Sequence, residues 1–263
     1  MNILDTIVEH KRKEVAYTRS IITESDLQQT EAFKKPCYSL KKTLTATGSS
    51  GIIAEFKRKS PSKGWINKDQ LVIPTIRGYQ VAGAAGVSIL TDAEFFGGGL
   101  EDVIAVRTEE QFSIPVLRKD FIIDEFQVLQ TKSLGADVML LIAAILTIDE
   151  VYKLASKAKA LGLEVLLEIH SSNEIGHINE YIDFVGVNNR NLKTFEVDIQ
   201  KSLELAPLIP NDKIMISESG INHAKDVILL KEHGFKGFLV GDRFMREKDP
   251  MRACEDFIKS LNH

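Results

Sequence analysis

Eight short runs of apolar, often β-branched residues recur from residue 51 onward, each followed by a polar patch and a stretch of helical periodicity. Continuous apolar runs of this length predict strands buried on both faces, and their alternation with helical patterns is typical of βαβ units with a parallel sheet. The runs are GIIAEFK from Gly51, VSILTD from Val87, IPVLRKD from Ile114, DVMLLIA from Asp137, LEVLLEI from Leu163, DFVGVNN from Asp183, KIMISES from Lys213 and GFLVGD from Gly237.

Eight such units fit a closed (β/α)8 barrel better than an open, doubly wound sheet, which remains the alternative. Barrels of this kind reach about 250 residues as one unit, so a length of 263 residues suits a single domain. The sequence contains no Pro/Gly-rich linker at which to place a boundary. We therefore expect an α/β protein with one TIM-barrel domain over residues 1–263, in which residues 1–50 form an N-terminal helical extension.

The extension opens with ILDTIVEHKRKEVAY, which places Ile3, Leu4, Ile7, Val8 and Val15 at helical spacing with charged residues between them. This pattern predicts an amphipathic helix. Two interpretations stay open. The extension either packs on the body of the barrel or covers one mouth of it and excludes water there.

Charge and cysteine content exclude several classes of function. The chain has 33 Lys and Arg against 37 Asp and Glu, a net charge of −4, so no global positive field attracts nucleic acid or an anionic membrane. Cys37 and Cys254 lack disulfide or zinc spacing, so we expect two free thiols. The N-terminus is charged and the apolar runs are too short to span a bilayer, which predicts a cytoplasmic protein.

Glu55 and Lys57 stand at the end of the first apolar run, where barrels carry catalytic groups. Both share the phase of Ile53, so all three side chains point inward if Ile53 does. A solvated run at Lys57, Arg58 and Lys59 is the alternative, and we expect it only for Arg58 and Lys59. An acid and a base inside a strand are costly unless they are paired or functional.

Charged and polar residues also end the later runs, and closure of a barrel brings them around one mouth. Two lysines and three carboxylates in a partly desolvated space shift one another's pKa values, which makes acid and base chemistry available near neutral pH. The pattern therefore predicts general acid and base catalysis. The residues at these strand ends are Glu55, Lys57, Lys119, Glu168, Asn188, Arg190, Glu218 and Ser219.

Two turns indicate a phosphate site. Ser219-Gly220 follows the seventh run and Gly241-Asp242 follows the eighth, each ahead of a helical pattern. Barrels commonly bind phosphate in these two units on backbone N–H groups, so the two turns together favour an anion site over ordinary turn chemistry. No nucleotide-binding or metal-binding motif is present, and we expect the isolated His170 to be a loop or core residue.

Six segments together resemble the indole-3-glycerol phosphate synthase family of tryptophan biosynthesis. The KxSPSKG and LRKDF motifs are specific to that family, and the similarity covers nearly the whole chain, including the opening ILDTIVEHKRKEV. The segments are AEFKRKSPSKGWI (54–66), VLRKDFIID (116–124), LLEIH (166–170), GVNNRNL (186–192), SESGI (217–221) and LVGDRFM (239–245).

The resemblance implies a carboxy-lyase that converts 1-(2-carboxyphenylamino)-1-deoxyribulose 5-phosphate to indole-3-glycerol phosphate with loss of CO2 and water. It implies neither a metal nor an organic cofactor. Separately, we expect a monomer, with a homodimer as the alternative. On the family's pattern Lys119 is the general acid of ring closure and Glu168 is the base of dehydration. Lys57 holds the anthranilate carboxylate or shares the acid role, while Glu55 and Asn188 orient and stabilise the intermediate.

The resemblance also implies how the substrate is bound. It gives a polar lining, an apolar pocket for the aromatic ring and a phosphate site. These comprise Ser60, Arg190, Glu218 and Ser219 for the lining, Pro61, Phe96, Phe121, Leu140 and Leu192 for the pocket, and Ser219, Gly220, Gly241 and Asp242 for the phosphate.

Asp242 departs from the family, in which serine is common at this position. Two charges about 4 Å apart repel by about 4 kcal/mol at an effective dielectric of about 20, so a carboxylate beside a phosphate dianion would weaken binding. We therefore expect the Asp242 side chain to turn away and only its backbone N–H to serve the phosphate.

Two other classes of barrel share some of these features. Phosphoribosylanthranilate isomerase and the tryptophan synthase α subunit bind phosphate similarly, but we do not expect them to combine Glu55, Lys57, the SPSKG segment and Lys119. A non-catalytic barrel that binds sugar phosphates would be expected to have lost Lys119 or Glu168, and this chain has both.

Overall fold

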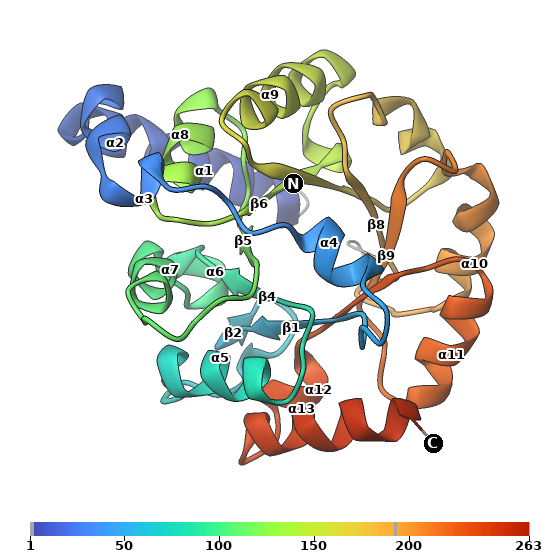
Figure 1. The fold of residues 1–263 in the computed structure, drawn as a ribbon. Helices are drawn as coiled ribbons and strands as arrows, with labels where there is room; N and C mark the ends of the chain where they lie inside the picture. Colours follow the sequence, from blue (N-terminus) through green and yellow to red (C-terminus); the bar gives the residue numbers. More distant parts are fainter. Residues whose placement is uncertain (1–2, 192–193, 263) are drawn as a thin grey trace.

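The computed structural model describes residues 3–191 and 194–262, and its centre is a closed barrel of eight parallel strands (Figure 1). The order around the barrel is β1-β10-β9-β8-β7-β6-β5-β4, so the last strand closes on the first. All eight apolar runs form these strands, which confirms the TIM barrel and excludes the doubly wound sheet. The strands are β1 (Ile52–Phe56), β4 (Gly86–Leu90), β5 (Val116–Lys119), β6 (Val138–Ile142), β7 (Glu164–Ile169), β8 (Phe184–Asn188), β9 (Ile214–Glu218) and β10 (Gly237–Val240).

Helices surround the barrel, and short additional helices and a two-stranded hairpin connect or follow these elements (Figure 1). The outer helices are α5 (Val72–Val81), α7 (Leu100–Arg107), α8 (Glu125–Ser133), α9 (Ile148–Ala160), α10 (Gln200–Leu205), α11 (Ala224–Glu232) and α13 (Pro250–Lys259). The additional elements are the hairpin of β2 (Lys59–Ser60) and β3 (Gly64–Trp65), the helices α6 (Ala93–Phe96) and α12 (Asp242–Met245), and the 3-10 helices η1 (Ala143–Ile145), η2 (Ser172–His177), η3 (Ala206–Leu208) and η4 (Ser260–Asn262).

The expectation of a helical pattern after every strand is wrong at one place, because only the 3-10 helix η2 connects β7 to β8. This connection contains Ser171, Ser172, Asn173 and Gly176. Serine and asparagine compete for backbone hydrogen bonds and glycine loses more conformational entropy, so all three disfavour a helix interior.

Strand residues alternate between the barrel interior and the layer under the helices. Ile53 lies in the interior cluster with Leu117 and Leu239, whereas its neighbours Ile52 and Ala54 pack in the outer cluster. The predicted inward phase of Ile53, and with it that of Glu55, is therefore confirmed.

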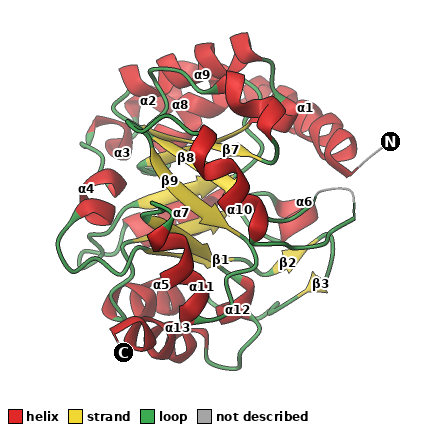
Figure 2. Ribbon diagram, turned by 90° about the vertical axis from the view of Figure 1, so that its right-hand side faces the viewer, coloured by secondary structure: helices red, strands yellow, loops and turns green. Residues whose placement is uncertain are grey.

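The N-terminal extension runs from one end of the barrel to the other through α1 (Ile3–Ile21), α2 (Glu24–Gln29), α3 (Glu31–Lys34) and α4 (Leu40–Thr45). Figure 2 shows α4 on the opposite side of the barrel from the β2–β3 hairpin. Leu40 packs against Gly86 at the start of β4, and Leu44 packs against Gly237 at the start of β10. Helix α4 therefore closes the end of the barrel at which the strands begin.

Helix α1 lies at the other end and contributes Ile3, Leu4 and Ile7 to the lining of the large cavity there. The same helix packs Val15 against Leu27 and residues of α8 on the side of the barrel. The helix therefore both packs on the body and reaches the mouth of the barrel, while the exclusion of water there stays a prediction.

Cys37 and Cys254 are free thiols in the described part of the chain, as predicted. Burial raises the pKa of the Cys254 thiol to about 12, so it remains protonated at neutral pH. No described helix is both long and apolar enough to cross a membrane.

Gly51 and Gly48 allow two effects of a side chain to be separated. Both have positive φ, 74° and 78°, but a Cβ at Gly51 would lie 2.7 Å from the carbonyl oxygen of Lys236, whereas open space surrounds Gly48. We expect Gly48→Ala to lower the free energy of unfolding by about 1 to 2 kcal/mol through backbone strain. Gly51→Ala should cost about 1 to 3 kcal/mol more, because a backbone carbonyl cannot swing aside. Thermal unfolding measures both, and equal losses would contradict the expected clash.

Candidate active site

A cavity of about 650 Å³ opens at the ends of the barrel strands. Each of the eight strands contributes to its lining, because parallel strands in a closed barrel all end at the same rim. One lining residue from each strand, in chain order, is Glu55, Leu90, Lys119, Leu140, Glu168, Asn188, Glu218 and Leu239.

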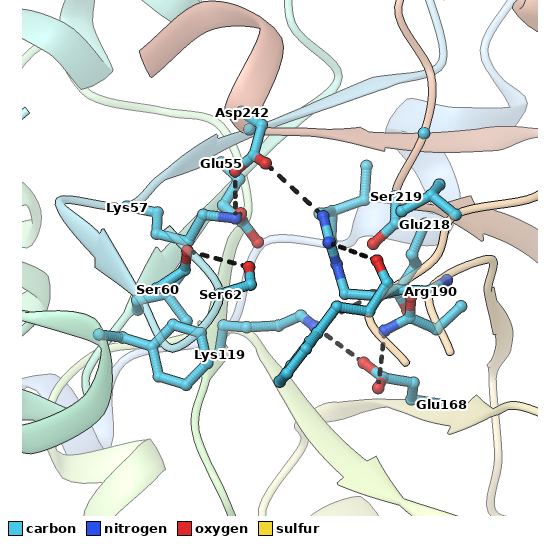
Figure 3. A pocket seen from close by; sticks show the side chains of 18 of the residues that line it. Glu55, Lys57, Ser60, Ser62, Lys119, Glu168, Arg190, Glu218, Ser219 and Asp242 are labelled. Carbon is cyan, nitrogen blue, oxygen red and sulfur yellow. Dashed lines mark hydrogen bonds and ion pairs between the residues drawn. The ribbon is translucent and has the colours of Figure 1, made fainter. Parts of the chain in front are cut away.

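The structure brings the site residues predicted from the sequence together around this cavity (Figure 3). Leu192 is the exception, because it lies outside the described residues. Those that line the cavity are Glu55, Lys57, Ser60, Pro61, Phe96, Lys119, Phe121, Leu140, Glu168, Asn188, Arg190, Glu218, Ser219, Gly220, Gly241 and Asp242.

Lys119 lies between two carboxylates at the end of β5. Its Nζ is 2.8 Å from Oε2 of Glu168 on β7 and 3.0 Å from Oε2 of Glu218 on β9 (Figure 3). Burial opposes the charge on Lys119, but the two carboxylates outweigh it and hold the pKa of the amine above its ordinary value. Lys119 is therefore an ammonium at neutral pH, the form that a proton donor needs.

Glu168 is held from three sides. Besides Lys119, Nδ2 of Asn188 donates to its Oε1 at 3.1 Å, and Nε2 of His170 lies 3.2 Å from the same oxygen. Burial opposes ionisation, but Lys119 and His170 outweigh it and hold the pKa of Glu168 well below its usual range. Glu168 is therefore a carboxylate, the form that a base needs.

His170 contributes to the site through its contact with Glu168, which was not predicted. Burial lowers its pKa, but Glu168 and Glu174 outweigh this effect and raise it to about 9. His170 lies in the loop after β7, as expected, and is mostly an imidazolium at pH 7, which also makes it an ionic partner of Glu168. The two-residue spacing from Glu168, which places two side chains on one face of an extended segment, is the signal that points to it.

The pKa of Glu218 is shifted in the opposite direction from that of Glu168, although both residues face the same ammonium. Burial raises the pKa of Glu218 to about 7, because Lys119 offsets burial only in part and the charge on Glu168 adds to it. Near neutral pH, Glu218 therefore exchanges a proton while Glu168 remains ionised.

Asp242 does not turn away from the cavity, so the prediction for its side chain is wrong. Its Oδ1 lies 2.8 Å from Nζ of Lys57, and its Oδ2 lies 2.9 Å from Nζ of Lys63 and 3.6 Å from Arg190 (Figure 3). Burial opposes ionisation, but Lys57 and Lys63 outweigh it and hold the pKa of Asp242 below its usual value. Three cations from other parts of the chain attract the carboxylate inward.

Lys57 also pairs with Glu55, whose Oε1 is 2.8 Å from its Nζ. Burial opposes the charge on Lys57, but Glu55 and Asp242 outweigh it and raise the pKa of the amine. Lys57 therefore points inward and is paired with Glu55, as predicted, and is not part of a solvated run.

Arg58 was expected to be solvated, and this expectation is wrong. Its guanidinium makes a bidentate pair with Asp102, at 2.6 and 3.0 Å, and lies 4.6 Å from the centre of the Phe56 ring. The planar guanidinium suits both contacts. Lys59 donates to the carbonyl oxygen of Glu94 at 2.6 Å. Together they fasten the segment after β1, including the β2–β3 hairpin, to α6 and α7.

The apolar side of the cavity is formed by Phe96 and Phe121, whose ring centres are 5.9 Å apart, together with Pro61 and Leu140. Ile3, Leu4 and Ile7 were not among the predicted site residues, although they lie on the helix that was expected either to pack on the body or to cover the mouth. They complete this side of the lining.

The opposite side of the cavity is polar and cationic. Ser219 and Gly220 have φ of 67° and 81°, and among the described residues only Phe195 and Ser219 combine positive φ with a side chain. Strained backbone of this kind is common where a ligand binds. Lys63, Arg243 and Arg246 also line the cavity and were missed as site residues, although Lys63 lies within the SPSKG segment.

A closed (β/α)8 barrel with an ammonium and a carboxylate beside an apolar pocket, and with cations opposite, has the architecture of a barrel enzyme that acts on an anionic small molecule with an apolar part. The family model described as indole-3-glycerol phosphate synthase matches residues 4–257. The chain therefore belongs to the indole-3-glycerol phosphate synthase family, whose members are decarboxylating lyases of tryptophan biosynthesis.

Curated relatives support this assignment along the whole chain. An indole-3-glycerol phosphate synthase of Bacteroides thetaiotaomicron is 45% identical over 260 residues, which covers 99% of each chain. One of Polynucleobacter necessarius is 39% identical over 269 residues, which covers 98% of this chain and 99% of the relative.

Solved structures of other proteins share the fold. The tryptophan synthase subunit alpha of Legionella pneumophila superimposes with a TM-score of 0.59 at 14% identity, covering 84% of this chain and 96% of that one. The 3-hexulose-6-phosphate synthase of Salmonella typhimurium gives 0.62 at 13% identity, covering 80% and 98%. At such low identity, these likenesses show the barrel fold alone.

The raised pKa of Glu218 has a consequence for stability. Glutamate in the unfolded chain ionises near 4.5, whereas Glu218 in the folded protein ionises near 7, so this residue makes folding less favourable as the pH rises between these values. Glu218→Gln does not ionise. We expect its stability relative to the wild type to increase by about 3 kcal/mol across this interval.

Thermal unfolding between pH 4.5 and 8 measures this difference, with the exposed Glu204→Gln as the matched control. A difference between Glu218→Gln and the wild type that does not change with pH would contradict the raised pKa.

Proposed function

We propose that Lys119 and Glu168 are the acid and the base with which this cavity converts 1-(2-carboxyphenylamino)-1-deoxyribulose 5-phosphate to indole-3-glycerol phosphate. The observation that carries this proposal is their pairing. An ammonium and a carboxylate lie 2.8 Å apart at the ends of β5 and β7, in the lining of one cavity. Each group is in the protonation state that its role requires.

Ring closure is the step that needs an acid. The aromatic carbon that bears the carboxylate attacks the ribulose carbonyl carbon, a C–C bond forms, and the carbonyl electron pair moves to oxygen. Lys119 donates a proton to that oxygen, which stabilises the transition state more than the ground state. Glu218, 3.0 Å away and titrating near pH 7, is placed to return a proton to Lys119.

Decarboxylation and dehydration follow. The bond from the ring carbon to the carboxylate breaks, CO2 leaves, and the electron pair neutralises the iminium formed on ring closure. Lys57 holds the carboxylate until that point, as a compact point charge can, or shares the acid role. Glu168 then removes a proton from the CH2 carbon beside the nitrogen. Lys119, which Glu218 has reprotonated, or Lys57 donates a proton to the hydroxyl group, which leaves as water.

Asn188 and Glu55 orient these groups. The Oδ1 atom of Asn188 accepts from the backbone N–H of Arg190 at 3.0 Å, which turns the Nδ2 atom toward Glu168. Glu55 pairs with Lys57 in the same way that Glu168 pairs with Lys119. Each lysine therefore has a fixed position before the substrate binds.

Substrate orientation follows from the two sides of the cavity. The aromatic ring binds against Pro61, Phe96, Phe121 and Leu140, with Leu192 as a further expected contact. The ribulose chain extends along Ser60, Arg190 and Glu218 to a phosphate site at Ser219, Gly220, Gly241 and Asp242. Lys63, which pairs with Asp242, adds positive charge to that end.

We also propose that residues 1–263 act as one domain, because α1 lines the catalytic mouth and α4 closes the other end. The enzyme is expected in the cytoplasm, as a monomer or, alternatively, a homodimer. Its small, phosphorylated substrate is its expected partner, without a metal, an organic cofactor, a nucleic acid or a membrane. The net charge of −4 agrees with the last two expectations.

Incubation of the purified protein with the substrate, without added metal, tests this proposal through the appearance of indole fluorescence. We expect Lys119→Ala to lose about 10²- to 10⁴-fold in kcat with a much smaller change in KM, since it removes a positioned acid. The exposed Lys248→Ala is the matched control and should retain activity. Near wild-type turnover by Lys119→Ala would exclude it as the acid.

Asp242 competes with the substrate for cations. Its carboxylate already neutralises Lys57 and Lys63, which the anionic groups of the substrate need. Asp242→Asn keeps the shape and removes the charge. We expect KM to fall about tenfold, about 1.4 kcal/mol, because partial exposure screens the full repulsion. Added salt should reduce the difference. A higher KM would mean instead that the carboxylate organises the lysines for the phosphate.

A further inference from the structure

Lys11 is a fully buried lysine on α1 that the proposed mechanism does not use. Its Nζ lies 3.0 Å from Oδ2 of Asp92, 2.9 Å from Oδ1 of Asp120 and 2.8 Å from Oε2 of Glu14. The side chains of Asp92 and Asp120 are also fully buried. One ammonium therefore joins α1 to the segments that follow β4 and β5, at a depth where an unpaired charge is very unfavourable.

The two aspartates hold the two aromatic walls of the cavity. Oδ1 of Asp92 accepts from the backbone N–H of Phe95 at 2.7 Å and so caps α6, which ends at Phe96. Oδ1 of Asp120 accepts from the backbone N–H of Phe121 at 2.8 Å. The ring centres of Phe96 and Phe121 are 5.9 Å apart. Because each aspartate is bonded to the segment that carries one of these rings, its position affects the gap between them.

Asp120 has other partners that fix it to β5. Its Oδ2 accepts from Oγ1 of Thr91 at 2.6 Å and pairs with the buried Arg118 at 2.9 Å. Lys11 is the ionic partner that Asp92 has in this cluster, through the oxygen that does not cap α6. The buried charges of Lys11 and Arg118 balance those of Asp92 and Asp120, and Glu14 is partly exposed.

Lys11 also fixes α1 at the mouth of the barrel. Ile3 and Ile7 precede it at intervals of four residues, so all three share one face of the helix. Ile3 and Ile7 line the cavity on its apolar side. The phosphate end lies at β9 and β10, neither of which neighbours β4 or β5 in the barrel.

We infer that Lys11 is a positioning residue that sets the gap between Phe96 and Phe121 and thereby the affinity of the site for the aromatic half of the substrate. The inference rests on the proposed function, which supplies that aromatic half as an anthranilate group. With the ammonium present, two buried carboxylates are drawn toward one point. Without it nothing draws the two groups toward that point, and the segments that carry the two rings separate.

The test compares two competitive inhibitors that each represent half of the substrate, namely anthranilate and ribulose 5-phosphate. In Lys11→Met we expect the inhibition constant of anthranilate to rise about tenfold and that of ribulose 5-phosphate to change less than about twofold. Arg19→Ala is the matched control, because Arg19 is on the same helix and pairs with Asp124. It should leave both constants unchanged.

A second variant covers the case in which Lys11→Met does not fold. Lys11→Met/Asp92→Asn removes one positive and one negative charge and keeps an oxygen for the backbone N–H of Phe95. We expect it to fold and to retain a selective loss of anthranilate affinity, because the link between α1 and α6 is still missing. Wild-type constants in the double variant, or equal losses for both inhibitors, would overturn the inference.

Turnover of the complete substrate by the wild type is measured first. Its absence would contradict the proposed function. Normal turnover by the wild type, combined with unchanged anthranilate inhibition in the folded Lys11 variants, would contradict the role of Lys11 alone.

Discussion

Closure of eight parallel strands into a barrel is the constraint on which the active site depends. Because every strand points the same way, each one ends at the same rim, and residues as distant in sequence as Lys57 and Asp242 meet there. The charged side chains at this rim are largely buried, since those of Lys57 and Lys119 are only 14% and 13% exposed, so each charge needs a partner across the rim. The arrangement of the site follows from that need.

Each charge at the rim finds its partner because lysines and carboxylates alternate around it. Lys57 lies between Glu55 and Asp242, and Lys119 lies between Glu168 and Glu218. The pairing does more than neutralise the rim, because the two partners of Lys119 have different surroundings. Asn188 and His170 stabilise the charge on Glu168. The pKa of Glu218, in contrast, is raised by burial and by the charge on Glu168. One ammonium thereby separates a carboxylate that stays ionised from a carboxyl group that exchanges protons near pH 7.

The fold and the convergence of the site could be predicted because both depend on local pattern. Apolar runs indicate strands, and the alternation of side chains along a strand indicates which residues face the barrel interior. The expectations that failed at Asp242 and Arg58 depended on partners elsewhere in the chain. Asp242 turns inward because Lys63 and Lys57 attract it, and Arg58 is held because Asp102 faces it. No spacing within a motif contains that information, and the position of α1 stayed open for the same reason.

The distance along the chain between Lys11 and its partners has a consequence for synthesis. Helix α1 leaves the ribosome long before Asp92 and Asp120 exist, and the barrel cannot close before β10 is made. During this interval, the apolar face of the helix with Ile3 and Ile7 has no barrel to cover. The first helix to be made must therefore wait for these residues before its buried lysine is paired, and its amphipathic face needs protection from aggregation in the nascent chain.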